Sequence, residues 1–181
     1  PRTVATVLVP FGLGYYLSYL YRTVNLVLSP HLAADLALSP TNLGLLTAVY
    51  FIVFAAFQTP LGVLLDRYGP RRVQSALLVF AAAGSALFAF ADEFVVLAIG
   101  RGLIGFGVSG CLMAAFKANV MWFPRERLPL FNGLTVAFGA FGALSATVPV
   151  EMIFDHMGWR AIFSILSGMT ILVAVLTYLV V

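Results

Sequence analysis

The sequence predicts an all-α membrane protein of six transmembrane helices, arranged as two inverted three-helix repeats. Three observations predict this fold class. First, the 181 residues are 62% hydrophobic and only 9% charged, with a mean hydropathy of +1.04, whereas soluble domains carry about 25% charged residues. Second, the apolar residues fall into long runs separated by short polar breaks. Third, one polar turn occurs twice, with three runs between its copies.

Each apolar run is close to or above the roughly 20 residues that a helix needs to cross a hydrocarbon core of about 30 Å. The runs cover about residues 4–28, 41–64, 73–91, 94–122, 129–150 and 161–181. The fourth run is long enough to tilt or bend. A β-barrel would instead show segments of about ten residues with strict alternation, and the sequence shows no such alternation.

The charges between the runs predict the orientation of the chain. One side of the predicted membrane carries the bases Arg2, Arg67, Arg71, Arg72, Arg125 and Arg127. The other side carries Asp35, Asp92, Glu93, Glu151 and Asp155, with Arg160 as its only strong base. The positive-inside rule then places the N-terminus and the loops 66–72 and 123–128 in the cytoplasm of a cell with this protein in its inner or plasma membrane. Because the basic residues gather on one side of the predicted membrane, the net charge of +3 does not indicate nucleic-acid binding, and we expect no nucleic-acid partner.

The internal repeat aligns residues 44–77 with residues 133–166 after a shift of 89 positions without gaps. Nine of the 34 aligned positions are identical, including Pro60 with Pro149 and the shared turn Asp-x-x-Gly-x-Arg. The turn reads DRYGPR at residues 66–71 and DHMGWR at residues 155–160. Because three spans separate the turns, the second copy is upside down. Such inverted repeats, here about 1–91 and 92–181, are typical of transporters.

The stretch GVLLDRYGPRR, residues 62–72, forms the predicted turn between the second and third helices. Gly62 would let a neighbouring helix approach closely, and Gly69 permits a tight turn. Asp66 ends the second helix, where its carboxylate opposes the dipole of its own helix. We therefore expect it to face a positive group. Arg71 and Arg72 would hold the turn in the cytoplasm, with Pro70 preventing the helix from continuing.

Charged residues inside the spans are the best indicators of function, because charge is costly in a membrane. Arg22 belongs to a polar face of the first helix that also contains Tyr15, Ser18, Tyr19 and Asn25. This face predicts contact with a protein cavity, where Arg22 would bind a carboxylate or phosphate. The alternative is an arginine that extends to the outer interface.

The remaining polar candidates allow both functional and structural roles. Gln58 shares a stripe with Phe54 and lines the same cavity or packs between helices. Arg101 and Lys117 lie in the fourth run, about 24 Å apart at 1.5 Å per residue, so they cannot bind one small ligand. Arg101 serves in hydrogen bonding or in proton relay, and Lys117 extends to the interface or contacts substrate.

These motifs resemble the hallmarks of the major facilitator superfamily. Gly62, Leu64, Asp66, Arg67 and Gly69 match its turn between helices two and three, although Pro70 moves the basic pair to Arg71 and Arg72. The stretch 101–107, RGLIGFG, is similar to its helix-four motif, and residues 122–127 and 158–160 match further ones. The resemblance implies that residues 1–181 are the N-terminal six-helix half of a twelve-helix transporter, with the C-terminal half absent from this chain.

The resemblance also implies a mechanism in which two halves rock around a midplane site. The turn containing Gly62, Asp66, Arg67, Gly69, Arg71 and Arg72 would then act as a latch that stabilises the outward-open state. The first helix is similar to that of the anion:cation symporter branch, in which a first-helix arginine binds an organic anion. Tyr21 stands where that branch often has an aspartate, and no carboxylate lies between Phe94 and Phe123.

The main hypothesis is a secondary active transporter of a small organic anion, in which Arg22 pairs with the substrate and Tyr15, Tyr19, Asn25 and Gln58 line its site. A coupling ion would be a further partner. One alternative is a transporter of a neutral or cationic solute in which Arg22 is structural. Another is a six-helix receptor or assembly subunit without transport. A six-helix chain would also work as a homodimer with a second copy. No motif of an enzyme, a cofactor site or a metal site is present in the sequence.

Overall fold

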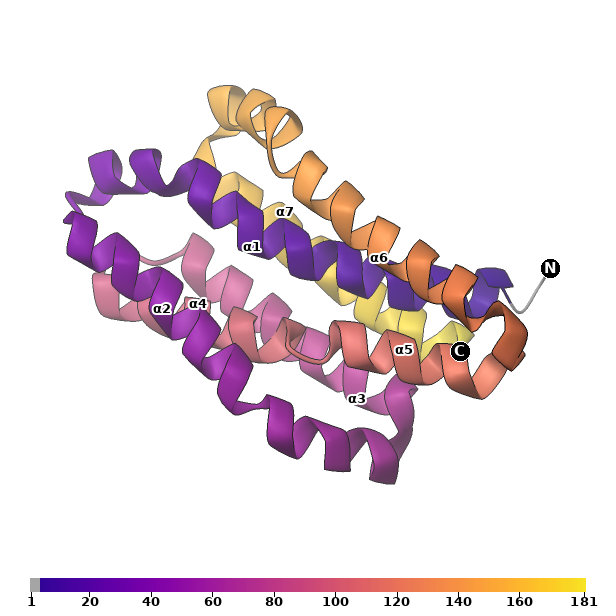
Figure 1. The fold of residues 1–181 in the computed structure, drawn as a ribbon. Coiled ribbons are helices and arrows are strands. Elements are labelled where there is room, and N and C mark those ends of the chain that lie inside the picture. The colour runs from indigo at the N-terminus through magenta and orange to yellow at the C-terminus, as the bar shows by residue number, and fades with distance from the viewer. Residues whose placement is uncertain (1–3) are drawn as a thin grey trace.

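The computed structural model describes residues 4–181, except for the side chains of Val148 and Asp155, and this range forms a helical bundle. The predictions for Arg2 and for the Asp155 carboxylate therefore lie outside the described residues. In chain order the elements are η1 Val4–Leu8, α1 Val9–Leu36, α2 Pro40–Ala56, α3 Gln58–Ala89, α4 Phe94–Val108, α5 Cys111–Trp122, η2 Arg125–Arg127, α6 Leu128–Ser145 and α7 Val148–Val180. Figure 1 shows both termini at the same end of the bundle.

Five helical stretches within residues 4–181 are long and apolar enough to cross a membrane. They are Val4–Leu36, Gln58–Ala89, Phe94–Trp122, Arg125–Ser145 and His156–Val180. The shorter apolar helix α2 continues after Phe57 into the first part of α3, which reverses at Gly69. The predicted class, an all-α bundle of apolar helices, is confirmed, and the boundaries of several helices differ from the prediction.

The first helix extends to Leu36, eight residues beyond its predicted end at residue 28. Pro30 lies inside it and cannot donate a backbone hydrogen bond to the carbonyl of Leu26. The Ser29 hydroxyl donates to that carbonyl instead, at 2.9 Å, which is how membrane helices tolerate proline. Ala37 follows the end of the helix and has a positive φ of 49°. The Ser39 side chain then accepts a hydrogen bond from the Asn42 amide and caps α2.

The second and fifth predicted spans, 41–64 and 129–150, are each interrupted. The α2 helix ends at Ala56, and α3 begins at Gln58. The α6 helix ends at Ser145, and α7 begins at Val148. A proline follows each interruption, Pro60 in one case and Pro149 in the other, and a proline cannot continue the hydrogen-bond ladder of the preceding turn. The predicted single helices are therefore bent at these positions.

The two halves of the chain share these boundaries. A shift of 89 residues carries α2 onto residues 129–145, and α6 occupies Leu128–Ser145. The same shift carries Gly69 onto Gly158, and their φ and ψ angles are nearly equal, 77° and 160° against 74° and 170°. This backbone region is populated almost only by glycine. The reversal within α3 lies toward the end of the bundle that holds both termini (Figure 1). These correspondences support the inverted repeat.

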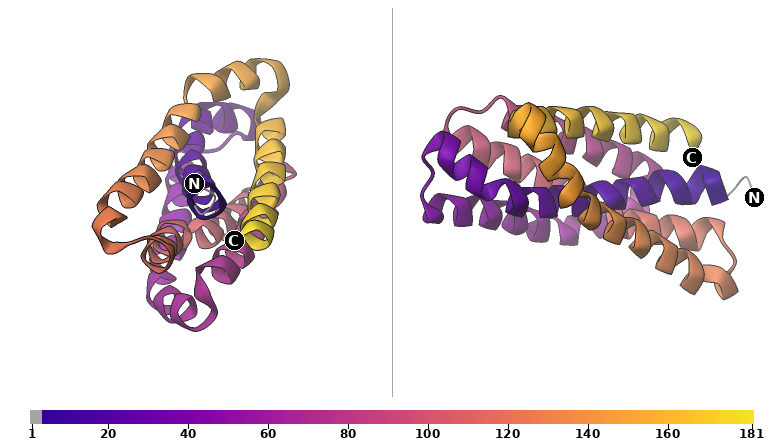
Figure 2. Two further views of the ribbon diagram at one scale, coloured as in Figure 1. Left: turned by 90° about the vertical axis from the view of Figure 1, so that its right-hand side faces the viewer. Right: turned by 90° about the horizontal axis from the view of Figure 1, so that it is seen from above.

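Glycines bring the helices into close contact. A Cβ at Gly142 of α6 would lie 2.2 Å from the Tyr16 carbonyl oxygen of α1, and one at Gly139 would lie 2.6 Å from the Tyr15 ring. Seen end-on in Figure 2, α1 lies between α6 and α7. Gly105 of α4 approaches α2 in the same way, since a Cβ there would lie 2.5 Å from the Tyr50 carbonyl oxygen. The backbones can approach this closely only because no side chain intervenes.

Candidate functional site

Three aromatic rings surround the Arg22 guanidinium on α1. Its central carbon lies 5.0 Å from the ring centre of Tyr19, 5.5 Å from that of Phe51 and 5.4 Å from that of Phe54. Each distance is within the range of cation–π attraction, about 6 Å. The N–H bonds of a guanidinium lie in its plane, so contacts with ring faces do not use its hydrogen-bonding capacity.

No carboxylate of the described residues is paired with Arg22. The two ion pairs in this part of the chain join Lys117 to Asp66 and Arg160 to Asp92. The Nε atom of Arg22 is buried without a hydrogen-bond partner. A cation inside an apolar bundle with an unpaired donor is energetically unfavourable unless a ligand or water satisfies it.

The polar face predicted on α1 is present, but its members have different environments. Tyr15 is buried, and its ring meets that of Tyr19 edge-on at 5.1 Å. The Ser18 hydroxyl points to the Val108 carbonyl of α4 at 3.5 Å. Asn25 is also buried, and its Oδ1 atom has no hydrogen-bond partner. Asn25 and Arg22 therefore contribute one unpaired acceptor and one unpaired donor to the same helix face.

Arg101 is fully buried and ties α4 to two other helices. Its Nη1 donates to the Tyr21 carbonyl of α1 at 3.2 Å, and its guanidinium lies 4.6 Å from the ring centre of Tyr50 on α2. Its Nε atom is unpaired, as is the Tyr50 hydroxyl. These contacts give Arg101 the hydrogen-bonding role that was one of its two predicted possibilities. Tyr21 stands at the position where the anion:cation symporter branch often has an aspartate. Its hydroxyl forms a hydrogen bond with the Thr170 hydroxyl of α7 at 2.9 Å.

Tyr50 is the member of this cluster that the sequence analysis missed. It is buried, its ring centre lies 4.6 Å from the Arg101 guanidinium, and its hydroxyl end is near Arg22. The available signal was its position four residues before Phe54, which places both on one helix face. An aromatic ring on that face can attract a nearby arginine, which an aliphatic side chain cannot do.

Gln58 lies apart from the aromatic rings around Arg22. Its amide nitrogen donates to the Ser109 carbonyl at 3.2 Å and to the Phe54 carbonyl at 3.3 Å. It therefore bridges the break after α2 and the break between α4 and α5. Gln58 also lines a hollow of about 350 Å³ that includes Gly62, Asp66 and Lys117. The structure thus brings Gln58 together with the predicted latch.

Asp66 faces a positive group, as expected, and that group is Lys117 of α5. The Asp66 side chain is 82% exposed and that of Lys117 is 28% exposed. The pair joins the end of the second span to the fourth span. Lys117 therefore belongs to the predicted latch region. It does not share a site with Arg101. A Cβ at Gly62 would meet nothing within 4 Å, so no helix of the described chain approaches Gly62 closely.

The basic residues of the turn differ in their contacts. Arg67 lies over the Tyr68 ring, with 5.4 Å to its centre. Arg71 donates to the Tyr178 carbonyl of α7 at 2.8 Å and stacks on the Tyr178 ring. Arg72 is exposed. In the part of the chain that the structure describes, no group of three or more His, Cys, Asp or Glu side chains could hold a metal ion.

Long apolar helices, with Arg22 and Arg101 among them, indicate an integral membrane protein. The chain belongs to the Major Facilitator Superfamily, whose family model matches residues 11–181. Members of this family are transporters and not enzymes. The predicted resemblance is therefore confirmed.

Several curated transporters are similar to this chain. A probable sulfoacetate transporter, SauU, of Cupriavidus necator is 26% identical over 88% of this chain and 37% of its own length. The hexuronate transporter of Bacillus subtilis is 31% identical over 90% of this chain and 38% of its own length. The niacin transporter NiaP of Acinetobacter baylyi is 28% identical, with 88% and 36% covered. The chain thus spans little more than a third of these relatives.

A solved structure gives the same fold. The bacterial homologue of the human lysosomal transporter Spinster, in an inward-facing and occupied conformation, superposes with a TM-score of 0.88 at 22% sequence identity. The alignment covers 99% of this chain and 44% of that protein. The helical bundle therefore matches slightly less than half of that solved transporter.

Proposed function

We propose that this chain is the N-terminal half of a secondary active transporter that carries a small organic anion by alternating access. Arg22 is the charge partner of the substrate. Tyr19 and Tyr15 pack beside it, and Asn25 supplies an acceptor for a substrate hydroxyl or amine. Gln58 lies apart from these rings and instead ties the Phe54 and Ser109 carbonyls together beside the predicted latch. The observation that carries the proposal is the Arg22 guanidinium, which is enclosed by aromatic rings and lacks a carboxylate partner among the described residues.

The geometry favours an anion over a neutral or cationic solute. A carboxylate or sulfonate accepts two parallel hydrogen bonds from an arginine fork, and such bonds strengthen in a site with little water. A cationic solute would meet both Arg22 and Arg101 near Tyr50, and like charges repel. The relatives named for sulfoacetate, hexuronate and niacin carry substrates with an acidic group, which also supports this choice.

The remaining parts of the proposal concern the complete protein. The relatives are more than twice as long as this chain, which supports a second six-helix half as the partner. The two halves would rock about a site near the membrane midplane. The end of the bundle that holds Arg67, Arg71, Arg72, Arg125 and Arg127 would face the cytoplasm of a cell membrane. A coupling ion would bind to the substrate or to the second half, because the fourth span has no carboxylate.

The test is uptake by the complete protein in liposomes. We expect saturable uptake of a small carboxylate or sulfonate, with competition by other organic anions. The amide or alcohol analogue of the same size should compete at least about tenfold more weakly, because it loses a charge-assisted bond of about 1.5–3 kcal/mol. Equal competition by the neutral analogue would overturn the assignment of an anionic substrate. Specific binding without flux would indicate a receptor.

We further propose that the Asp66–Lys117 pair belongs to a latch that the second half completes. The supporting observations are the exposure of Asp66 and the hollow beside Gly62 and Gln58. An exposed ion pair contributes only about 0–1 kcal/mol to stability. The pair is therefore better suited to biasing two conformations than to holding the bundle together.

Replacing Asp66 with asparagine should shift the complete protein toward the inward-open state. The lost pair of about 0.5–1 kcal/mol changes the ratio of the two states by roughly two- to fivefold. Spin-label distances across the two ends of the protein measure this ratio. Asp92→Asn is the matched control, because it removes an equally exposed carboxylate from the Arg160 ion pair at the other end. An unchanged ratio in Asp66→Asn would contradict the latch.

A further inference from the structure

Arg72 differs from the other bases of the Gly69 turn because no described residue is its partner. Arg71 is bound to Tyr178, and Arg67 lies over Tyr68. Arg72 makes no hydrogen bond, ion pair or ring contact with any described residue. The Arg72 side chain nevertheless lines two separate apolar grooves, one on each side of α3.

The first groove lies between the part of α3 before Gly69 and the part after it. It has a volume of about 340 Å³. Tyr68 and Arg72 form one end, and an aromatic cluster of Phe57, Phe80 and Phe106 forms the other. The Phe106 ring centre lies 4.4 Å from that of Phe57 and 5.3 Å from that of Phe80. The groove therefore runs from a basic, tyrosine-containing mouth to an apolar end lined by aromatic rings.

The second groove lies between α3 and α7 and also has a volume of about 340 Å³. Arg72 and Tyr178 stand in it together with Val79, Ala174 and Val175. Ala76 lines both grooves, one turn beyond Arg72 on α3. Its methyl group forms only a low ridge between them. One cation with one tyrosine on either side thus stands above two parallel apolar grooves.

We propose that these two grooves and Arg72 hold one diacyl phospholipid with an anionic headgroup. Its phosphate pairs with the Arg72 guanidinium, and its two acyl chains lie on opposite sides of α3, astride Ala76. Tyr68 and Tyr178 lie at the level of the headgroup and glycerol, where tyrosine is enriched in membrane proteins. This site is independent of Arg22 and of the proposed substrate.

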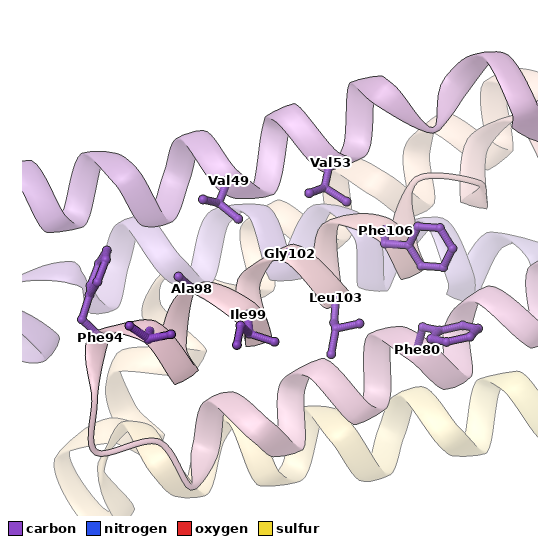
Figure 3. A pocket seen from close by; sticks show the side chains of 10 residues that line it. Val49, Val53, Phe80, Phe94, Ala98, Ile99, Gly102, Leu103 and Phe106 are labelled. Atoms are coloured by element: carbon purple, nitrogen blue, oxygen red, sulfur yellow. The ribbon is translucent and has the colours of Figure 1, made fainter.

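The dimensions agree with a lipid of one leaflet. Arg72 and Phe80 are eight residues apart on α3, which is about 12 Å along a helix. One leaflet of a hydrocarbon core of about 30 Å is about 15 Å deep. A chain that begins at Arg72 therefore ends near Phe80 and Phe106. Beyond these rings lies a wider apolar cavity of about 650 Å³ between α2, α3 and α4, with Val53, Leu103 and Phe106 in its wall (Figure 3). A longer chain would extend into it.

The charge of the mouth selects the headgroup. A basic residue at the membrane surface favours anionic over zwitterionic lipid by about fivefold. The bases Arg67, Arg71 and Arg72 all belong to this end of the bundle. Only Arg72 both lines the grooves and lacks a partner among the described residues. Arg72 is therefore the residue that distinguishes phosphatidylglycerol from phosphatidylcholine at this site.

The experiment is native mass spectrometry of the complete protein in detergent with equal amounts of phosphatidylglycerol and phosphatidylcholine of the same chains. We expect one tightly retained phosphatidylglycerol, preferred about fivefold or more. Arg72→Gln should reduce the preference to about one. Arg125→Gln is the matched control, because Arg125 is an exposed base at the same end that lines neither groove. An unchanged preference in Arg72→Gln would overturn the headgroup contact.

The acyl chains are tested separately with Ala76→Trp. Ala76 is exposed, so the indole should fill the grooves without disturbing the core. We expect retention of both lipids to fall at least fivefold. Ala83→Trp is the matched control, since Ala83 is exposed two turns along α3 and lines neither groove. Equal retention in Ala76→Trp and Ala83→Trp would overturn the placement of the chains. Phosphatidylglycerol should also raise the melting temperature of the wild type more than that of Arg72→Gln, and an equal rise would contradict the site.

Discussion

Replacing Arg22 with alanine in the complete protein is expected to reduce kcat/KM for uptake of the organic anion by about 10- to 100-fold or more. The loss corresponds to a charge-assisted hydrogen-bond pair of about 1.5–3 kcal/mol. Arg22→Lys should retain part of the activity, because it keeps the charge but loses the planar fork and its stacking on three rings. Initial rates of uptake in liposomes over a range of substrate concentrations measure the effect.

Two controls separate substrate binding from folding. Arg125→Ala removes the same charge from an exposed position and should leave uptake unchanged. The melting temperature of Arg22→Ala should stay close to that of the wild type, because no carboxylate of the described residues loses its partner. If Arg22→Ala transported the anion normally, Arg22 would be structural and the substrate site would lie elsewhere.

Gly142→Ala is expected to cause the largest loss of stability among single substitutions on α6. Its Cβ would lie 2.2 Å from the Tyr16 carbonyl oxygen, which is backbone and cannot rotate away. The α1 and α6 helices would have to separate, and overpacking of this kind costs about 1–3 kcal/mol or more. The melting temperature of the purified protein, followed by size-exclusion chromatography after heating, measures the loss.

Gly133→Ala is the matched control on the same helix. A Cβ at Gly133 would meet nothing within 4 Å, and Gly133 is exposed. Alanine favours a helix over glycine by about 0.5–1 kcal/mol. We therefore expect Gly133→Ala to be neutral or slightly stabilising. A Gly142→Ala protein that melts with Gly133→Ala would show that the α1–α6 crossing tolerates a wider separation.

The sequence by itself determined the fold class and the family. Hydrocarbon imposes long apolar helices, so composition and run length were sufficient to predict spanning helices. The shared turn DRYGPR and DHMGWR was readable because its backbone requires glycine at Gly69 and Gly158, which the structure places at nearly identical angles. Arg22 and the other membrane charges could be named from their rarity alone.

Only the tertiary structure decided which of these residues meet. The continuation of α1 past Pro30 to Leu36 accompanies a single hydrogen bond, that of Ser29 with Leu26, which hydropathy does not detect. The bends at Phe57 and after Ser145 each precede a proline, but their positions are seen only in the structure. The placement of Tyr50 near Arg22 and Arg101, the pairing of Asp66 with Lys117, and the two grooves at Arg72 each join helices that are distant in the sequence. Side-chain periodicity defines a face of one helix, whereas the neighbour of that face is set by where glycines allow two backbones to approach.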